Sequence, residues 1–281
     1  MEGYQLAQEQ VENFIHHLAE EERSWGTQEK YRRDIRAFRL WLAGRPVNKE
    51  NLADWKAHLL EKGYCPTTVN SMLTAVNMLL RHTGLESCCV RTLRIQRKVF
   101  RDPAKELGRE DYRRLCNTAQ AQGKERLALL IESICATGMR VSEVRYLTVE
   151  ALRQGQVQIA LKGKIRVILL PGKLCRKLLN YTRRKKITSG EVFRTRNGNP
   201  LGRKQIWAEM KGLCEAAGVD STKVFPHNLR HLFAREFYKI SQDVVKLADV
   251  LGHSSIETTR IYLLSTGSEH IRQLERLRLI F

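Results

Sequence analysis

The sequence predicts a mainly α-helical protein of two domains, the second of which contains a small antiparallel β-sheet. Apolar residues recur at helical spacing along most of the 281 residues, and only two neighbouring stretches, QVQIAL and IRVILL, alternate instead. The charge also changes along the chain. Residues 1–90 hold 11 Lys/Arg against 12 Asp/Glu, whereas residues 91–281 hold 38 against 18. The length is sufficient for two separate hydrophobic cores.

Residues 1–90 are expected to form a small helical domain. Within residues 26–44, Tyr31, Ile35, Phe38 and Leu42 fall on one apolar stripe. A second helix is predicted over residues 48–62, with Gly63 as its cap, and a third after Pro66. The positions predicted to be buried in these two helices are Leu52, Trp55, Leu59, Val69, Met72, Leu73, Val76, Leu79 and Leu80.

Two of these helices also carry polar residues at helical spacing on another face. These residues are Arg32, Arg33, Arg36 and Arg39 on the first helix, and Asn70, Thr74, Asn77 and Arg81 on the third. Arginine suits phosphate groups, and Asn and Thr suit base edges, so both faces could lie against DNA. Solvated helix faces have the same composition, and the pattern alone leaves both interpretations open.

Residues 91–108 are interpreted as a basic linker, with a break at Asp102-Pro103, and residues 109–281 as the second domain. A helix that ends at Gly138 is predicted to bury Leu127, Leu130, Ile131 and Ile134. The next helix is expected over residues 139–155, with Arg140 and Glu143 at positions i and i+3.

The only strands expected to pair form a hairpin. QVQIAL places Val157, Ile159 and Leu161 on one face, and IRVILL repeats the alternation at Ile165, Val167 and Leu169. Lys162-Gly163-Lys164 lies between them. A basic helix over residues 173–186, a short strand at 191–193 and a helix before Gly218 should follow. The last is predicted to bury Ile206, Trp207, Met210, Leu213 and Ala217.

Composition narrows the classes of function. The net charge of +19 points to a polyanionic partner, with nucleic acid ahead of an anionic membrane surface. No apolar run is long enough to span a membrane, and the N-terminus lacks the pattern of a secretory signal. The seven cysteines are scattered and form no C-x-x-C pair, which argues against a disulfide framework or a zinc ribbon. A cytoplasmic protein is therefore expected.

The chemistry is concentrated in residues 226–262, which contain His227, Arg230, His253 and Tyr262. A tyrosine hydroxyl can attack phosphorus, but its ordinary pKa of about 10 requires a base or a strongly cationic site. Arginine grips phosphate oxygens bidentately and stays charged, so it can stabilise the charge that develops on them. A lysine at the hairpin tip could protonate the leaving oxygen.

Such a site needs no metal, and no tight acidic cluster suited to Mg²⁺ lies near these residues. His227 and His231 do spell H-x-x-x-H, a spacing that can bind zinc. The metalloprotease form requires Glu directly after the first His, where this chain has Asn228. Zinc is therefore the weaker interpretation.

Four motifs in series carry a resemblance to a known family: ATGMRVSEV at 136–144, KGK at 162–164, HNLRH at 227–231 and LGHSSIETTRIY at 251–262. Their order and spacing resemble those of the tyrosine recombinase (phage integrase) family in its short two-domain form. TQEKYRRDIRAFRLWL and TTVNSMLTAVNMLLR are similar to the core-binding domain of that family. The resemblance implies a helical SAM-like core-binding domain followed by an α-rich catalytic domain.

By this resemblance, Arg140 and Arg230 would hold the scissile phosphate. Tyr262 would be the nucleophile, and Glu143 would support the site. The bland alternatives are an ordinary helix ion pair for Arg140 with Glu143, and a core position for Tyr262.

The resemblance also implies roles for the proton-transferring residues. His227 would act as general base and phosphate contact, and His253 would donate to a non-bridging oxygen. Lys162 would protonate the leaving 5′ oxygen. The loop here is shorter than the family's frequent G-K-G-x-K-x-R form, so Lys164 could serve in its place. His231, one turn after His227, is interpreted as a packing residue or as a residue that supports the site from behind its catalytic groups, and not as a catalyst.

The implied function is site-specific recombination of double-stranded DNA through a 3′-phosphotyrosine intermediate, without a nucleotide or metal cofactor. Members of the family act as tetramers that pass a C-terminal segment to a neighbour, a role that suits residues 268–281 here, although this segment could also dock on its own domain. A bacterial, phage or mobile-element protein is expected. A DNA-binding protein that does not cut, and a relaxase or topoisomerase, are the alternatives.

Overall fold

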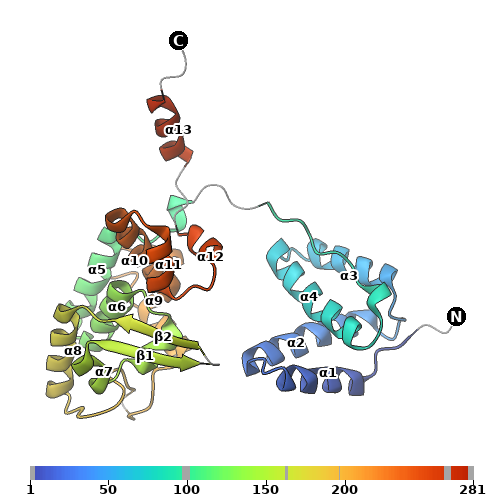
Figure 1. Cartoon of the computed structure of the whole chain (residues 1–281), viewed down its shortest axis with the longest axis horizontal. Helices are drawn as coiled ribbons and strands as arrows, with labels where there is room; N and C mark the ends of the chain where they lie inside the picture. The colour runs from blue at the N-terminus through green and yellow to red at the C-terminus, as the bar shows by residue number, and fades with distance from the viewer. Residues whose placement is uncertain (1–3, 97–101, 162–163, 196, 263–266, 278–281) are drawn as a thin grey trace. The chain divides into compact units, whose positions relative to one another are not determined.

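The computed structural model describes residues 4–96, 102–161, 164–195, 197–262 and 267–277. The chain divides into two compact units, Met1–Arg97 and Lys98–Phe281, which are described separately (Figure 1). None of the helices in the described residues is long and apolar enough to cross a membrane.

The N-terminal unit is helical throughout. Its elements are α1 (Gln8–Glu20), α2 (Trp25–Leu42), α3 (Lys49–Glu61), α4 (Pro66–His82) and a short 3₁₀ helix, η1 (Glu86–Cys88). Side-chain caps begin two of the helices, because Ser24 accepts from the amide of Thr27 and Asn48 from that of Asn51. Helix α2 packs against each of the other three α-helices.

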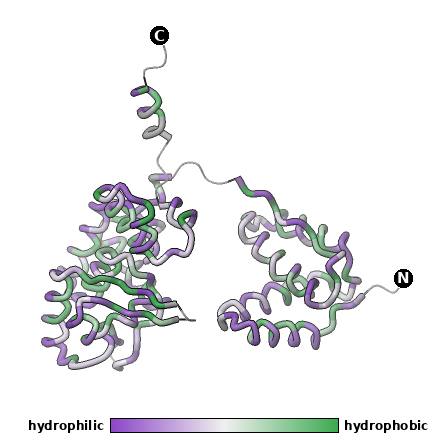
Figure 2. The backbone as a smooth tube through the Cα atoms, viewed as in Figure 1, coloured by the Kyte–Doolittle hydropathy of each residue, from purple (hydrophilic) through white to green (hydrophobic). Residues whose placement is uncertain are grey.

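The core of this unit confirms the predicted apolar stripes. Ile35, Phe38 and Leu42 are buried on α2, and all nine positions predicted on the next two helices are buried as well. Each of these helices carries both hydrophobic and hydrophilic residues along its length, as expected for helices with one buried side (Figure 2).

The C-terminal unit contains all the other helices and strands of the described residues. They are η2 (Pro103–Lys105), α5 (Arg109–Ala121), α6 (Glu125–Thr137), η3 (Val141–Tyr146), α7 (Val149–Gln154), β1 (Gln156–Leu161), β2 (Lys164–Leu169), α8 (Gly172–Arg184), α9 (Arg203–Lys211), η4 (Ser221–Lys223), α10 (Pro226–Ser241), α11 (Val244–Leu251), α12 (Ile256–Arg260) and α13 (Gly267–Arg276).

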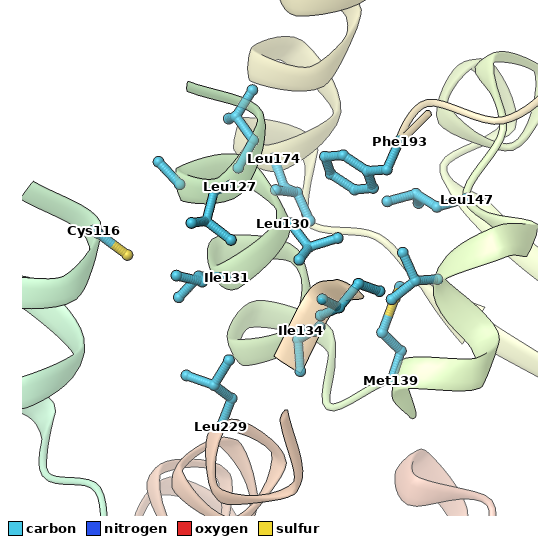
Figure 3. Close-up of a cluster of buried hydrophobic side chains, with 14 of the residues drawn as sticks. Cys116, Leu127, Leu130, Ile131, Ile134, Met139, Leu147, Leu174, Phe193 and Leu229 are labelled. Atoms are coloured by element: carbon cyan, nitrogen blue, oxygen red, sulfur yellow. The ribbon is translucent and has the colours of Figure 1, made fainter. Parts of the chain in front are cut away.

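Helix α6 is the centre of this unit. It packs against α5, α8 and α10, and its residues Leu127, Leu130, Ile131 and Ile134 are buried as predicted (Figure 3). Leu229 of α10 points into the same cluster. The start of α10, which carries His227 and Arg230, is therefore anchored by the core.

Both strands of the predicted hairpin are present, but Ile165, Val167 and Leu169, the alternating positions of the second strand, do not share a face with Val157 and Ile159. The register places Ile159 opposite Arg166 and Val157 opposite Ile168, so odd-numbered residues of β1 share a face with even-numbered residues of β2. Val157 and Ile159 are buried. All three outward positions of β2 are apolar: Ile165 and Leu169 are 77% and 73% exposed, and Val167 is 43% exposed.

The single helix predicted over residues 139–155 is also wrong. The chain forms η3 and α7 instead, and Leu147 and Thr148 separate them. The Thr148 hydroxyl caps α7 by accepting from the amide of Ala151, and its backbone bridges to Glu191. This bridge is isolated, so residues 191–193 do not form the short strand that was expected.

Helix α13 carries the apolar stripe predicted for the end of the chain. Ile271, Leu274 and Leu277 are 57%, 65% and 57% exposed. Phe281, the last member of the predicted stripe, lies outside the described residues.

Gly138 is required both by its backbone and by its surroundings. Its φ is +63°, and a Cβ atom there would lie 2.4 Å from Cδ1 of Phe233. We expect Gly138→Ala to lower the free energy of unfolding of the C-terminal unit by about 2–4 kcal/mol, from backbone strain and overpacking together. Urea unfolding followed by circular dichroism measures this change.

Gly155→Ala is the matched control, because Gly155 has a φ of +72° but nothing lies within 4 Å of its Cβ position. It should cost only the strain, about 1 kcal/mol. Equal losses in the two variants would show that the contact with Phe233 contributes nothing.

Candidate active site

The residues predicted to carry the chemistry come from four separate elements and meet at one cavity. Arg140 precedes η3, His227 and Arg230 lie in the first two turns of α10, His253 follows α11, and Tyr262 follows α12. All five line a cavity of about 730 Å³ in the C-terminal unit. The structure therefore brings together residues that are up to 122 positions apart in the sequence.

Three guanidinium groups converge on the carboxyl end of α11. In the order of the backbone carbonyls of residues 250–252, the donors are Arg166 (3.5 Å), Arg230 (2.8 Å) and Arg140 (3.3 Å). The last carbonyls of a helix have no partner within the helix and form the negative end of its dipole. They are consequently a natural anchor for cationic side chains.

Arg230 is the most deeply held of the three, with 2% of its surface exposed. Besides the carbonyl of Leu251, it donates to the carbonyl of Gly138 at 2.5 Å and lies 2.9 Å from Nε2 of His253. Burial lowers the pKa of Arg230, while a hydrogen bond with the Tyr262 side chain acts in the opposite direction. An arginine remains charged under these conditions.

The hydrogen bonds of His253 determine its tautomer. A guanidinium group has only N–H donors, so Nε2 of His253 must accept from Arg230. The ring proton is therefore on Nδ1, which donates to Oγ1 of Thr259 at 2.8 Å. Burial, followed by the charge of Arg230, lowers the pKa of His253 to about 4, which agrees with a neutral ring.

Tyr262 is packed among three imidazole rings. Its ring stacks on that of His253 at a centroid distance of 5.6 Å and an interplanar angle of 14°. The rings of His231 and His227 lie at 4.4 Å and 6.0 Å. Only 4% of Tyr262 is exposed, and the residue lines the cavity.

His231 packs directly against Tyr262, which agrees with its interpretation as a packing residue or a support of the site. Its position one turn after His227 was the available signal, because residues at i and i+4 share a helix face. Burial lowers the pKa of both imidazoles, that of His231 to about 3. Both are neutral at pH 7, and the two rings meet edge to face at 4.5 Å.

Glu143 supports the site through two arginines. Its Oε2 accepts from the backbone amide of Arg140 at 2.6 Å, and its Oε1 accepts from the side chain of Arg140 at 3.0 Å and from Arg166 at 2.5 Å. Sequence reasoning missed Arg166. The hairpin register turns it inward, and its match to the last position of the G-K-G-x-K-x-R form was the available signal.

Of the two lysines predicted near the hairpin turn, only Lys164 belongs to the described residues. Lys162 lies outside the described residues. Lys164 is the first residue of β2 and pairs with Leu161, which places it at the end of the hairpin nearest the turn.

Helix α9 adds a basic and aromatic wall that the motifs did not indicate. Arg203, Lys204 and Trp207 all line the cavity. The prediction that Trp207 is buried is wrong, because the indole is half exposed on the cavity side of the helix, while Ile206 and Met210 reach the core.

In the N-terminal unit, three of the four arginines predicted on α2 face helix α1. Arg32, Arg36 and Arg39 line a groove of about 620 Å³ together with residues of that helix. Arg32 pairs with Glu12 at 3.1 Å, and Arg39 hydrogen-bonds Gln8. Arg33 is separate from this groove: its side chain is 74% exposed, and its guanidinium pairs with the neighbouring Asp34 at 3.1 Å.

The predicted face of α4 is only partly open. Asn77 is buried, and its amide binds the backbone of Val90 through both its oxygen and its nitrogen. Asn70 holds the backbone of Leu93 in the same way, at 2.7 and 2.8 Å. The expectation that Asn77 lies on an open polar face is therefore wrong, and both amides fasten residues 90–93 to the helix. Thr74 and Arg81 are exposed as predicted.

Among the described residues, no group of three or more His, Cys, Asp or Glu side chains is arranged to hold a metal ion. His227 and His231 thus lack a third ligand for the zinc alternative in that part of the chain, and their rings contact Tyr262 instead.

The buried imidazoles should make folding sensitive to acid. In the unfolded chain they titrate near 6.5, whereas in the folded protein the pKa values are about 3 for His231 and about 4 for His253. The unfolded state therefore binds more protons within this window, and stability falls as the pH drops from about 6.5 toward 3. We expect the thermal unfolding midpoint of the C-terminal unit to fall over this range.

His231→Phe should weaken that fall, because one of the responsible groups is removed. Above about pH 7 the variant and the wild type should show no difference in slope, since the imidazoles are neutral in both states. An unchanged slope at acid pH would contradict the burial of a neutral His231.

Comparison with known proteins follows the division into two units. The sequence model of the Phage integrase family matches residues 105–269, and that of the phage integrase N-terminal SAM-like domain matches residues 11–83. Tyrosine recombinase XerA of Thermococcus kodakarensis is 30% identical over 97% of this chain and 96% of its own length. Tyrosine recombinase XerD of Vibrio cholerae is 28% identical over 87% of each.

Solved structures share the fold. A lambda integrase (residues 75–356) dimer bound to a COC′ core site has a TM-score of 0.72 at 16% identity, over 91% of this chain and 94% of that one. XerH bound to its difH substrate has a TM-score of 0.68 at 19% identity, over 95% and 84%. The family match extends over more than half of the sequence, and so the chain belongs to the phage integrase family of tyrosine recombinases, enzymes that break and rejoin DNA strands.

Proposed function

We propose that this protein is a site-specific DNA recombinase that cuts and rejoins strands through a covalent 3′-phosphotyrosine intermediate at Tyr262. The observation that carries the proposal is the cavity itself. A tyrosine, two arginines and two neutral histidines face one space, beside a hairpin whose turn carries lysines. Each of these groups has a task in the transfer of a phosphoryl group to an alcohol oxygen.

In the proposed cleavage step, the Tyr262 oxygen forms a bond to the scissile phosphorus while the bond from phosphorus to the 5′ oxygen breaks. The phenolic proton goes to a base and the 5′ oxygen gains a proton, so the DNA is left with a 3′-phosphotyrosine ester and a free 5′-hydroxyl. Rejoining is the reverse reaction with the 5′-hydroxyl of a partner strand. The ester conserves the bond energy, so no nucleotide is consumed.

Arg140 and Arg230 would hold the non-bridging oxygens. The Arg140 side chain is 42% exposed and keeps N–H groups that its contacts with Glu143 and Gly252 do not use. Arg230 lines the same cavity, and its position is fixed by the backbone carbonyls of Gly138 and Leu251. Because both groups are held before substrate arrives, little reorganisation is needed as charge develops.

His227 suits the role of general base, because burial keeps its imidazole neutral at pH 7 and able to accept a proton. His253 begins with an unprotonated Nε2 turned to Arg230. A phosphate bound to Arg230 would replace that contact and favour a protonated ring, which could then donate to a phosphate oxygen. Lys162 is proposed as the acid that protonates the 5′ oxygen.

Double-stranded DNA is the proposed partner of both units. The excess of 38 basic over 18 acidic residues in positions 91–281 suits a polyanion, and the N-terminal unit would add Arg32, Arg33, Arg36, Arg39, Thr74 and Arg81. Asn70 and Asn77 leave this set, because their amides bind the backbone. The wall of α9 would contact DNA beside the scissile phosphate.

We further propose that four copies act on two recombination sites and exchange residues 268–281. The exposed stripe of Ile271, Leu274 and Leu277 supports this, because an apolar stripe of this kind is usually covered by a partner. A structural neighbour is a lambda integrase tetramer bound to a Holliday junction. Integration, excision or resolution of a mobile element is the proposed biological use.

Tyr262→Phe tests the nucleophile directly. It should bind DNA as the wild type does, because only one oxygen is lost, but should form no covalent adduct with a nicked substrate that traps the cleaved state. Gel electrophoresis under denaturing conditions measures the adduct, and a shift assay measures binding. An adduct formed by Tyr262→Phe would show that the nucleophile is another residue.

The same substrates separate the alternative functions. A wild-type protein that binds but never forms an adduct would be a DNA-binding protein that does not cut. An adduct that is resolved without transfer to a second DNA site would favour a relaxase or topoisomerase. Strand exchange that depends on a second site is the result expected for a recombinase.

A substrate with sulfur in place of the leaving 5′ oxygen should identify the general acid. A thiolate leaves without protonation, because the thiol pKa is about 8.5. Lys162→Ala is expected to slow cleavage of the oxygen substrate about 10²–10⁴-fold and to recover on the sulfur substrate. Lys164→Ala is the matched control and should show neither effect. Recovery confined to Lys164→Ala would move the role to that residue.

A further inference from the structure

Arg166 is a largely buried cation that contacts Glu143 and the end of α11 without lining the cavity. It lies on the inward face of β2, opposite Ile159, and only 13% of its side chain is exposed. It does not line the cavity, so it is not placed to touch a phosphate there. Its partners, however, belong to the two elements that present Arg140 and His253 to the cavity.

The first partner is Glu143. Its Oε1 accepts from both Arg166 and Arg140, so the carboxylate is shared between two guanidinium groups. Without Arg166, the whole charge of Glu143 would face Arg140, the more exposed of the two. Arg166 therefore limits how strongly Glu143 can draw the Arg140 side chain away from the cavity.

The second partner is the turn that ends α11. Nη2 of Arg166 approaches the carbonyl of Val250 at 3.5 Å, and its stem passes directly beneath Gly252. A Cβ atom on Gly252 would lie 2.6 Å from Nε of Arg166 and 2.7 Å from its Cδ. This close fit holds the turn against the hairpin one residue before His253.

We propose that Arg166 is a positioning residue that fixes Arg140 and His253 by holding Glu143 and the end of α11 from strand β2. The inference rests on the proposed function, because these two residues matter only if they act on a phosphate. It adds a physical link between the hairpin and the rest of the site. The strand that begins at Lys164 also carries Arg166, so the hairpin cannot move far without disturbing both contacts.

Arg166→Met removes the charge and the hydrogen bonds but retains much of the apolar stem. We expect single-turnover adduct formation to slow on the order of 10–100-fold, the effect of small displacements of catalytic groups. DNA affinity should stay unchanged, because the guanidinium is shielded from solvent. Arg166→Lys should give an intermediate rate, since one ammonium group cannot serve Glu143 and the turn together. Val167→Ala, on the outward face of the strand, is the matched control and should behave as wild type.

A double-mutant cycle with Glu143→Gln distinguishes positioning from a general loss of stability. If Arg166 acts through Glu143, Arg166→Met should cost much less in the Glu143→Gln background than in the wild type. The double variant also leaves no unpaired buried charge, so it is expected to fold. Rate losses that simply multiply would overturn the proposal, as would a normal rate for Arg166→Met.

A measurement without DNA separates failure of this inference from failure of the proposed function. Hydrogen exchange at the amides of Gly252 and His253 should quicken in Arg166→Met, while exchange in α7 stays as in the wild type. Unchanged exchange at the turn would overturn the role of Arg166 whether or not the protein cuts DNA. Faster exchange in a protein whose wild type forms no adduct would support the link while rejecting the recombinase function.

Discussion

The active site depends on the carboxyl end of α11, where three successive backbone carbonyls receive three arginines. A helix end of this kind offers unpaired acceptors and the negative pole of the dipole, so it can hold cations that would otherwise repel one another. The three carbonyls therefore hold the three arginines at fixed positions although their charges repel one another. It also places His253 directly beyond the last carbonyl, so His253, Arg140 and Arg230, the residues proposed to contact the phosphate, share one support.

Burial then sets the protonation states that phosphoryl transfer needs. The arginines keep their charge despite desolvation, because their ordinary pKa values lie far above neutrality, whereas the imidazoles lose theirs. The result is a site with permanent cations for the phosphate and neutral rings for proton transfer. Tyr262 lies among these rings, with its hydroxyl close to Arg230. The same burial lowers the pKa values of His231 and His253, so the stability of the fold is expected to fall at acid pH.

The register of the hairpin decides which side chains of β2 are buried and which are exposed. Its register turns Ile165, Val167 and Leu169 outward and Arg166 inward. With the two faces of β2 exchanged, the strand would contribute only apolar packing. In the observed register, β2 contacts Glu143 and the end of α11 through Arg166, so elements that are separate in sequence support one another.

Local patterns in the sequence predicted most of the helices, the two strands of the hairpin, and the candidate residues Arg140, His227, Arg230, His253 and Tyr262, which the structure brings to one cavity. Periodicity and motif order report such features because they depend on near neighbours in the chain. Tertiary structure alone decided the strand register, the break between η3 and α7, the cavity position of Trp207 and the role of Arg166. It also showed that Asn77 faces the backbone of Val90. Each of these outcomes rests on contacts between distant residues, and no spacing within a single element contains that information.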